Sequence, residues 1–257
     1  MNAAIKPYQV KVLDKLCEFR PVKGLRILEI GGASDGAVAG EVLTRGAREV
    51  ISINNRKDIK STIFSENYKV YNMDARKLEF KDEHFDMVLG IAVLEHLHDL
   101  DIVCDEIYRV LKNDGLVYLH GGPLYTCSLG HHVWVHVDGV KYEFNGFNPI
   151  PDWYHLIFSK REMKEYLISG KNIPGDHADK IVHFIYDHPN INRYKYEDYK
   201  RILNESKLKI VLFEEQDWKN PSKEILNLLA AKNHDPQLNY KTGALDIMLI
   251  KESIRGI

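Results

Sequence analysis

The chain has 257 residues, of which 44% are hydrophobic and 28% charged, and a formal net charge of −2 at pH 7. These values are typical of a globular protein with a sizeable core, and the interleaved charges do not favour nucleic acid or an anionic membrane as partners. Cys17, Cys104 and Cys127 are odd in number and far apart, so they indicate neither a disulfide framework nor a thiolate zinc site. The N-terminal residues resemble a helix rather than a signal peptide, and we expect a cytoplasmic protein.

Residues 25–120 alternate short apolar runs with amphipathic stretches. The runs are 26–30, 49–53, 69–73, 85–93 and 115–120, and the amphipathic stretches are 34–45, 56–66 and 99–112. This alternation is typical of βαβ units around a parallel sheet. Gly115 follows the third stretch, at a position where a helix C-terminus favours a left-handed residue.

The regular pattern breaks after His120. Residues 121–193 are rich in Gly, Pro, Asn, aromatic residues and histidines, with one clear helix signal at 159–167. Order returns with a helix near 195–206, a strand at 208–214, a helix near 221–231 and a strand at 244–252. We therefore predict one α/β domain over 1–257, with a Rossmann-like, mostly parallel, seven-stranded sheet, helices on both faces, and a substrate-binding insertion or lid at 121–193 after strand five.

A glycine turn, ILEIGGASDG, follows the first predicted strand. Glu29 ends the apolar run, Gly31 and Gly32 follow, and a helix is expected from near Ser34. Such a turn exposes backbone to a ligand at a helix N-terminus, although a tight connection without a ligand has the same pattern. Ala33 stands where the dinucleotide fingerprint needs its second glycine, so a ligand without a pyrophosphate fits better.

These motifs resemble those of class I S-adenosylmethionine-dependent methyltransferases. In this resemblance, the glycine turn lies under the amino-acid part of the cofactor, Asn54 of ISINN replaces the usual ribose-binding acid, and Asp74 of NMDARKLEF receives the adenine amino group. The most specific part is FDMVLGIAVLEHLHDL followed by EIYRVLKNDGLVYL. The resemblance implies S-adenosyl-L-methionine as cofactor, bound by Glu29, Gly31, Gly32, Asn54, Asp74, Ala75, Ala92 and Glu95. Two alternatives stay open: Asn55 shares the ribose contact, or Asp74 is only a turn or capping acid.

The acceptor should lie beyond the carboxyl ends of the strands, which places the segment after strand five near the methyl group. His131 and His132 are candidate general bases for an oxygen nucleophile. Strand alternation in GHHVWVHV would point only one of them inward, and we favour His132, with Trp134 on its face. Candidate acceptor-binding residues are Tyr125, Trp134, Trp153, Tyr154 and Arg193. Structural histidines, or a metal site that includes Asp138 and Glu143, are alternatives, but we assign no metal.

The function we expect is O-methylation of a small-molecule or carbohydrate-type acceptor by direct displacement, with no nucleic acid or membrane partner. One alternative is a nicotinamide-dependent oxidoreductase, since Tyr196 and Lys200 have the Tyr-x-x-x-Lys spacing. The other is a protein that binds S-adenosylmethionine without catalysis.

Overall fold

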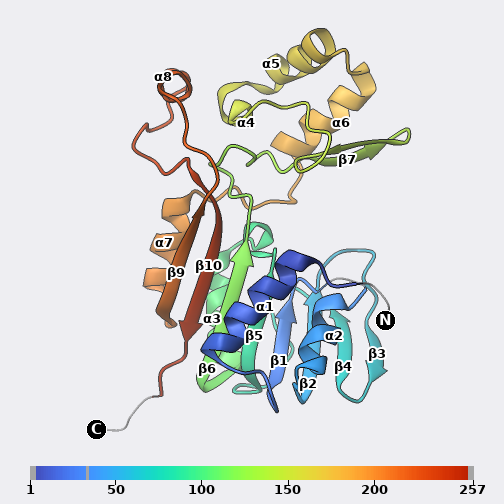
Figure 1. The fold of residues 1–257 in the computed structure, drawn as a ribbon, viewed down its shortest axis with the longest axis vertical. Helices are drawn as coiled ribbons and strands as arrows, with labels where there is room; N and C mark the ends of the chain where they lie inside the picture. The colour runs from blue at the N-terminus through green and yellow to red at the C-terminus, as the bar shows by residue number, and fades with distance from the viewer. Residues whose placement is uncertain (1–3, 33–34, 254–257) are drawn as a thin grey trace. The chain divides into compact units, whose positions relative to one another are not determined.

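The computed structural model describes residues 4–32 and 35–253 of the chain, which form two compact units (Figure 1). The first unit holds the described residues up to Gly121, Arg201–Glu214 and those from Leu245 onward. The second unit holds Gly122–Lys200 and Glu215–Ala244. The segment expected to be an insertion, 121–193, lies almost entirely within the second unit.

The first unit alternates strands and helices along the chain. Its elements up to Gly121 are α1 (Pro7–Phe19), β1 (Arg26–Ile30), α2 (Ala37–Thr44), β2 (Glu49–Asn54), β3 (Thr62–Ser65), β4 (Tyr68–Asn72), β5 (Phe85–Ile91), the 3-10 turn η1 (Leu94–His96), α3 (Leu100–Val110) and β6 (Leu111–Gly121). Two later strands, β9 (Lys209–Asp217) and β10 (Thr242–Ile250), join the same sheet.

The central sheet has the strand order β3-β4-β2-β1-β5-β6-β10-β9. The β1 strand pairs in parallel with β2 and β5, β2 with β4, and β5 with β6, whereas β3 and β10 are antiparallel to β4 and β6. The predicted Rossmann-like, mostly parallel sheet is therefore confirmed. All the parallel strands end at one edge, which is where open sheets of this class bind ligands.

Two details of the sequence prediction are wrong. The sheet has eight described strands rather than seven, because residues 56–66, expected to be helical, contain the edge strand β3. Its branched and aromatic residues favour a strand. The Phe64 ring stacks on the ring of Tyr68 in β4, with 5.2 Å between the two ring centroids. Gly115 does not end α3: it lies within β6, and the left-handed residue is Asp114.

Helices cover both faces of the sheet, with α1 and α2 on one face and α3 on the other (Figure 1). Apolar side chains at helical spacing explain this packing: Leu13 and Leu16 of α1 and Ala39 of α2 are fully buried. Tyr118 of β6 lies in the same core cluster, and its hydroxyl donates to Asp246 of β10 at 2.5 Å. The sheet is thus held rigidly beneath the loops that follow its strands.

The second unit combines a hairpin with short helices. Its elements are β7 (Trp134–Val137), β8 (Val140–Glu143), α4 (Tyr154–Ile157), α5 (Lys160–Glu165), the π-helix η2 (Tyr166–Gly170), α6 (Gly175–Tyr186), the first half of α7 (Tyr196–Glu205) and α8 (Lys223–Ala231). The helix expected at 159–167 is α5, which begins at a capping box: Glu162 N–H donates to the Ser159 hydroxyl, and Ser159 N–H donates to the Glu162 carboxylate. The sequence analysis missed α6.

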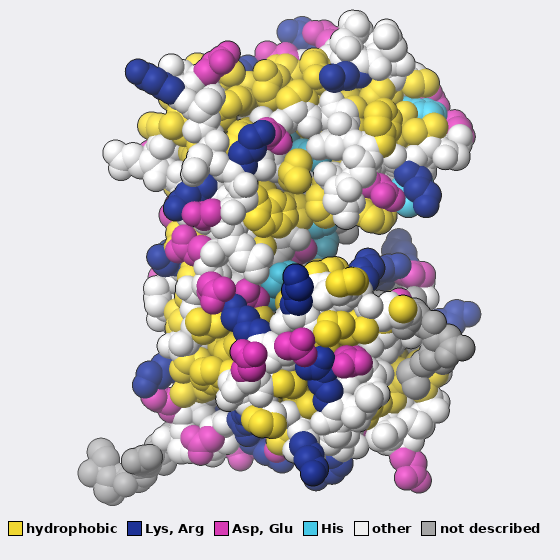
Figure 2. Space-filling view, viewed as in Figure 1, with side chains coloured by type: hydrophobic (Ala, Val, Ile, Leu, Met, Phe, Trp, Pro, Cys, Tyr) yellow, Lys and Arg dark blue, Asp and Glu magenta, His cyan; other side chains and the backbone are white. Residues whose placement is uncertain are grey.

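Acidic and basic side chains are interspersed over the surface that Figure 2 shows, in agreement with the mixed charge pattern of the sequence. Among the described residues, no helix has both the length and the apolar character required to cross a membrane.

Candidate active site

The turn after β1 depends on its two glycines. Gly31 has a φ of +79°, and a Cβ atom there would lie 2.5 Å from Cγ2 of Val93. A Cβ on Gly32 would lie 2.7 Å from Cβ of Ser52, so neither position accommodates a side chain without displacing a buried neighbour. The Gly31 N–H donates to the Ile53 carbonyl at 2.9 Å, which fixes the turn against β2. Ala33 and Ser34, the next positions of the motif, lie outside the described residues.

The helix after the turn begins at Ala37 rather than near Ser34. Gly36 precedes it with a φ of +65°, and the Asp35 carboxylate accepts a hydrogen bond from the Ala37 N–H at 3.0 Å. Asp35, which replaces a glycine of the family motif, therefore satisfies one of the unpaired N–H groups at the start of α2.

Glu29 lies buried directly beneath the turn. Its side chain accepts a hydrogen bond from the Ser52 hydroxyl, the residue opposite it in β2. Burial raises the pKa of Glu29 to about 7, and the nearby charge of Asp35 adds to this effect, whereas the bond from Ser52 opposes it. A carboxyl group in this state would gain from a positively charged ligand group, such as the ammonium of an amino acid.

Asn54 occupies the last position of β2, as the resemblance implies. Its side-chain amide donates to the Gly32 carbonyl at 3.0 Å, and its side-chain oxygen accepts from the Arg56 N–H at 3.0 Å. Asn54 therefore connects the glycine turn to the loop after β2.

Asp74 follows β4 and is surrounded by hydrogen-bond donors. Its Oδ1 atom accepts from the backbone N–H of Arg76 at 2.9 Å and from Arg76 Nε at 3.0 Å, and its Oδ2 atom accepts from Arg76 Nη2 at 2.7 Å. Asn55 adds a longer bond to Oδ2 at 3.4 Å, while Arg76 also pairs with Asp99 at 2.7 Å. The hydrogen bonds from Arg76 lower the pKa of Asp74 to about 2, so the group is a carboxylate at neutral pH. Ala75, the next predicted residue, is buried.

The chain bends sharply at the end of β5. Ala92 has a φ of +53°, and its N–H donates to Nδ1 of His120 in β6 at 3.4 Å. Glu95 in η1 is 3% exposed and lies so close to Gly121 that a Cβ there would be 2.2 Å from Glu95 Oε2. The predicted residues Ala92 and Glu95 thus lie next to the ends of β5 and β6.

The structure contradicts the alternation argument for His131 and His132. The β7 strand begins only at Trp134, so the two histidines precede it, and both are buried whereas Trp134 is exposed. Nδ1 of His131 accepts from the Val133 N–H at 3.1 Å, and its Nε2 lies 3.3 Å from the Asn148 amide. Burial lowers the pKa of His131 well below its usual value, and the neighbouring histidines add to this effect. The His132 ring packs against the Phe144 ring, with 4.7 Å between the two ring centroids.

The other candidate acceptor residues differ in their surroundings. Trp153 is 2% exposed, and its indole Nε1 donates to the Tyr240 carbonyl at 3.1 Å, which makes it part of the core of the second unit. Tyr125 and Tyr154 are half-buried. Nη2 of Arg193 donates to two carbonyls at the end of α6, those of Ile185 and His188.

The two acids weighed as metal ligands contact different histidines, and Asp138 also lies in a group with Asp176 and His177 whose ligand atoms are within 4.8 Å of one another. His136 Nε2 lies 2.7 Å from the Glu143 carboxylate, and Asp138 lies 3.2 Å from Nε2 of His177 in α6. Tyr142 contacts the other ring nitrogen of His177 at 2.9 Å. These contacts link the β7–β8 hairpin internally and to α6.

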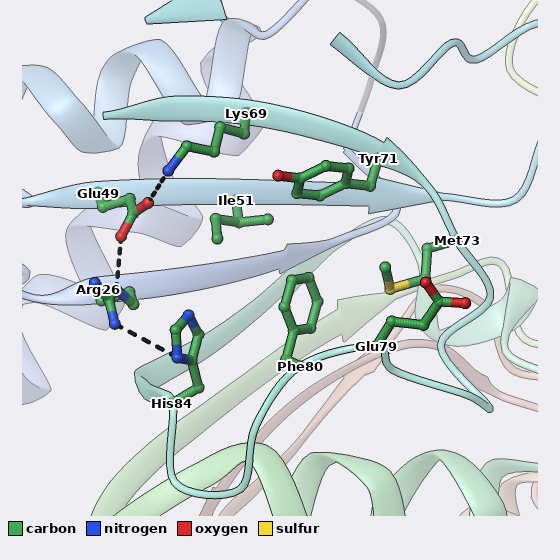
Figure 3. Close-up of a pocket in the computed structure, with 9 residues that line it drawn as sticks. All are labelled: Arg26, Glu49, Ile51, Lys69, Tyr71, Met73, Glu79, Phe80 and His84. Atoms are coloured by element: carbon green, nitrogen blue, oxygen red, sulfur yellow. Dashed lines mark hydrogen bonds and ion pairs between the residues drawn. The ribbon is translucent and has the colours of Figure 1, made fainter. Parts of the chain in front are cut away.

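A cavity of about 480 Å³ lies along the sheet, from Arg26 and Glu49 at the amino ends of β1 and β2 to Met73, just past the carboxyl end of β4 (Figure 3). Glu49 there pairs with Arg26 at 2.6 Å and with Lys69 at 2.5 Å. Burial alone would raise the pKa of Glu49, but the hydrogen bonds from Lys69 and Arg26 lower it. This ion-pair cluster is therefore separate from the glycine turn, at the amino ends of the strands.

Sequence reasoning missed three side chains that shape the site: Ser52, Arg76 and His120. Ser52 was detectable as the one polar residue inside the apolar run EVISI, in register with Glu29. His120 is the polar last residue of the apolar run GLVYLH, which places it at the ligand-binding edge. Arg76 belongs to no motif, and although it lies only two residues after Asp74, its pairing with Asp99 comes from another loop.

Comparison with known proteins identifies the domain. Residues 28–119 match the family model described as a methyltransferase domain. A ubiquinone biosynthesis O-methyltransferase of Pelagibacter ubique is 27% identical over 123 residues, covering 45% of this chain and 47% of the relative. A ubiquinone/menaquinone biosynthesis C-methyltransferase of Psychromonas ingrahamii is 26% identical over 156 residues, covering 56% and 58%. The chain thus spans about half the length of the curated relatives it matches.

The fold is also shared with solved structures. An S-adenosylmethionine-dependent methyltransferase of Listeria monocytogenes superposes with a TM-score of 0.55 and 15% identity, covering 95% of this chain and 99% of that one. The methyltransferase domain expected from the glycine turn, from the strand-end residues and from the EHLHD and RVLK motifs agrees with this comparison. Residues 28–119 are similar to methyltransferase domains, and the chain shares its fold with solved S-adenosylmethionine-dependent methyltransferases.

Proposed function

We propose that the protein transfers the methyl group of S-adenosylmethionine to an oxygen atom of a small-molecule or carbohydrate-type acceptor. The observation that carries this proposal is the set of strand-end residues around the glycine turn. A buried Glu29 lies beneath Gly31 and Gly32, and an ionised Asp74 follows a neighbouring strand. An ammonium group suits the first carboxyl, and an adenine amino group suits the second.

The reaction needs little from the protein beyond alignment. Methyl transfer from a sulfonium is a direct displacement, in which the nucleophile's oxygen forms a bond to carbon as the carbon–sulfur bond breaks. Oxygen as the acceptor atom is supported by relatives named O-methyltransferases, although one relative is named a C-methyltransferase. A general base would take the acceptor's proton.

We propose His132 as that base and residues 121–193 as the acceptor-binding insertion of a single methyltransferase domain. The ring nitrogens of His131 contact Val133 and Asn148, and we keep the preference for His132 from the sequence analysis. Tyr125, Trp134, Trp153, Tyr154 and Arg193 remain the proposed acceptor contacts, and we propose no bound metal.

The oxidoreductase alternative is less well supported. The Tyr196 hydroxyl donates to Glu215, and the Lys200 ammonium lies 5.0 Å from the centroid of the Tyr196 ring. Two helical residues paired in this way carry no sign of a nicotinamide site, and the family comparison favours methyl transfer.

The proposal is tested by incubating the protein with S-adenosylmethionine and a panel of hydroxylated aromatics and sugars while measuring S-adenosylhomocysteine release. His132→Ala should lower turnover by about 10²- to 10⁴-fold on the active acceptor without changing cofactor affinity. His136→Ala is the matched control, because His136 is exposed and paired with Glu143. Equal turnover of the His132 variant and wild type would refute the role of His132, and oxidation of an acceptor with NAD would refute the proposed function.

A further inference from the structure

The residue at the ribose position of the family motif already uses both ends of its side-chain amide in the structure. Asn54 uses its amide to hold the Gly32 carbonyl and its oxygen to accept from the Arg56 N–H, each at 3.0 Å. Turning this side chain toward a ligand would break both bonds and release the glycine turn that the ligand needs. Asn54 therefore has a structural role in its present rotamer.

The next residue has the freedom that Asn54 lacks. Asn55 is exposed at the carboxyl end of β2, and its side chain makes one long hydrogen bond with the described residues, to Oδ2 of Asp74 at 3.4 Å. A hydrogen bond of this length is weak, and the side chain can leave it at little cost. An amide also offers a donor and an acceptor together, which matches a pair of vicinal hydroxyls.

The surroundings of Asp74 indicate what would displace Asn55. An ionised carboxylate has about four acceptor positions. Arg76 fills three of them with bonds of 2.7–3.0 Å, two of these charge-assisted, and Arg76 is itself anchored by Asp99. A neutral adenine amino group cannot compete with the guanidinium, so the position it can take is the one that Asn55 occupies.

We infer that Asn55, rather than Asn54, contacts the ribose hydroxyls of the cofactor. On binding, the adenine amino group replaces the Asn55 amide on Asp74, and the released amide turns to the ribose. Asn54 keeps its two bonds and holds the turn in both states. This inference rests on the proposed S-adenosylmethionine site, and it assigns the two neighbouring asparagines different roles.

The inference is tested by isothermal titration calorimetry, which compares the affinities of wild type and two variants for two ligands. The ligands are S-adenosylhomocysteine and its 2′,3′-dideoxy analogue, which lacks both ribose hydroxyls. Asn55→Ala should weaken binding of S-adenosylhomocysteine by about three- to tenfold, the range for lost hydrogen bonds, and leave binding of the analogue within about twofold of wild type. Asn54→Ala, the matched control, should weaken both ligands by the same factor.

The opposite pattern would overturn the inference. If Asn55→Ala weakens both ligands equally, then Asn55 does not contact the ribose hydroxyls. If the loss in Asn54→Ala disappears with the dideoxy analogue, then Asn54 contacts them instead. Thermal unfolding of each variant without ligand checks that the fold is intact. Failure of the wild-type protein to bind S-adenosylhomocysteine at all would refute the proposed function itself, so the two failures are distinguishable.

Discussion

Glu29→Gln is expected to change how the stability of the protein depends on pH. Burial raises the pKa of Glu29 from 4.5 to about 7, so the folded protein keeps this proton to a higher pH than the unfolded chain does. The stabilisation from this group is therefore complete below pH 4.5, falls as the pH rises toward 7, and is lost above that. Since one pKa unit corresponds to 1.36 kcal/mol, ionisation of Glu29 should cost the fold about 3 kcal/mol at pH 8.

The assay is urea denaturation of wild type and variant between pH 4.5 and 8. Gln accepts the Ser52 hydrogen bond without titrating, so the stability of the variant relative to wild type should increase by about 3 kcal/mol across this range. Glu66→Gln, at an exposed turn, is the control for the substitution of a glutamate by glutamine outside the buried site. A constant difference for Glu29→Gln would refute the claim that Glu29 titrates near neutral pH.

Three further outcomes are expected. Asp74→Ala should weaken binding of S-adenosylhomocysteine by about 1–3 kcal/mol, measured by calorimetry, because the adenine amino group loses its acceptor; unchanged affinity in a folded variant would mean that adenine binds elsewhere. Gly31→Ala should lower the melting temperature and abolish cofactor binding, since its Cβ would meet Val93 at a positive φ; wild-type behaviour would contradict the turn geometry. Trp153→Phe should cost about 1–3 kcal/mol in urea denaturation by leaving the Tyr240 carbonyl unpaired; a smaller loss would mean that water replaces the indole.

Much of the sheet could be predicted, because buried parallel strands are short apolar runs between amphipathic helices. All five strands expected before His120 are present, as are the helices α1, α3, α7 and α8. The edge strand β3 was mistaken for a helix because its residues are exposed on both faces and so have no alternating pattern. The α6 helix was missed in a segment whose Gly, Pro and His residues obscure its apolar face.

The candidate site was predictable in position but not in its bonding. The apolar runs and the order of the motifs predicted Glu29 and Asp74 near the ends of their strands, and the structure has them there. What the sequence could not indicate is which side chains are already paired. The bond of Asn54 to Gly32 joins two loops, and Arg76, which bonds Asp74 within its own loop, is also held by Asp99 from another loop. Strand alternation does not apply to His131 and His132, because β7 begins only at Trp134, whereas the assignment of a general base stays a prediction.

The most direct test of the account is a titration of the wild-type protein with S-adenosylmethionine, S-adenosylhomocysteine and NAD under identical conditions. The account predicts saturable, one-to-one binding of the first two ligands, at a site that Asp74→Ala weakens, and no measurable binding of NAD. Tighter binding of NAD than of S-adenosylmethionine, or binding of neither adenosyl ligand, would contradict the assignment of this site.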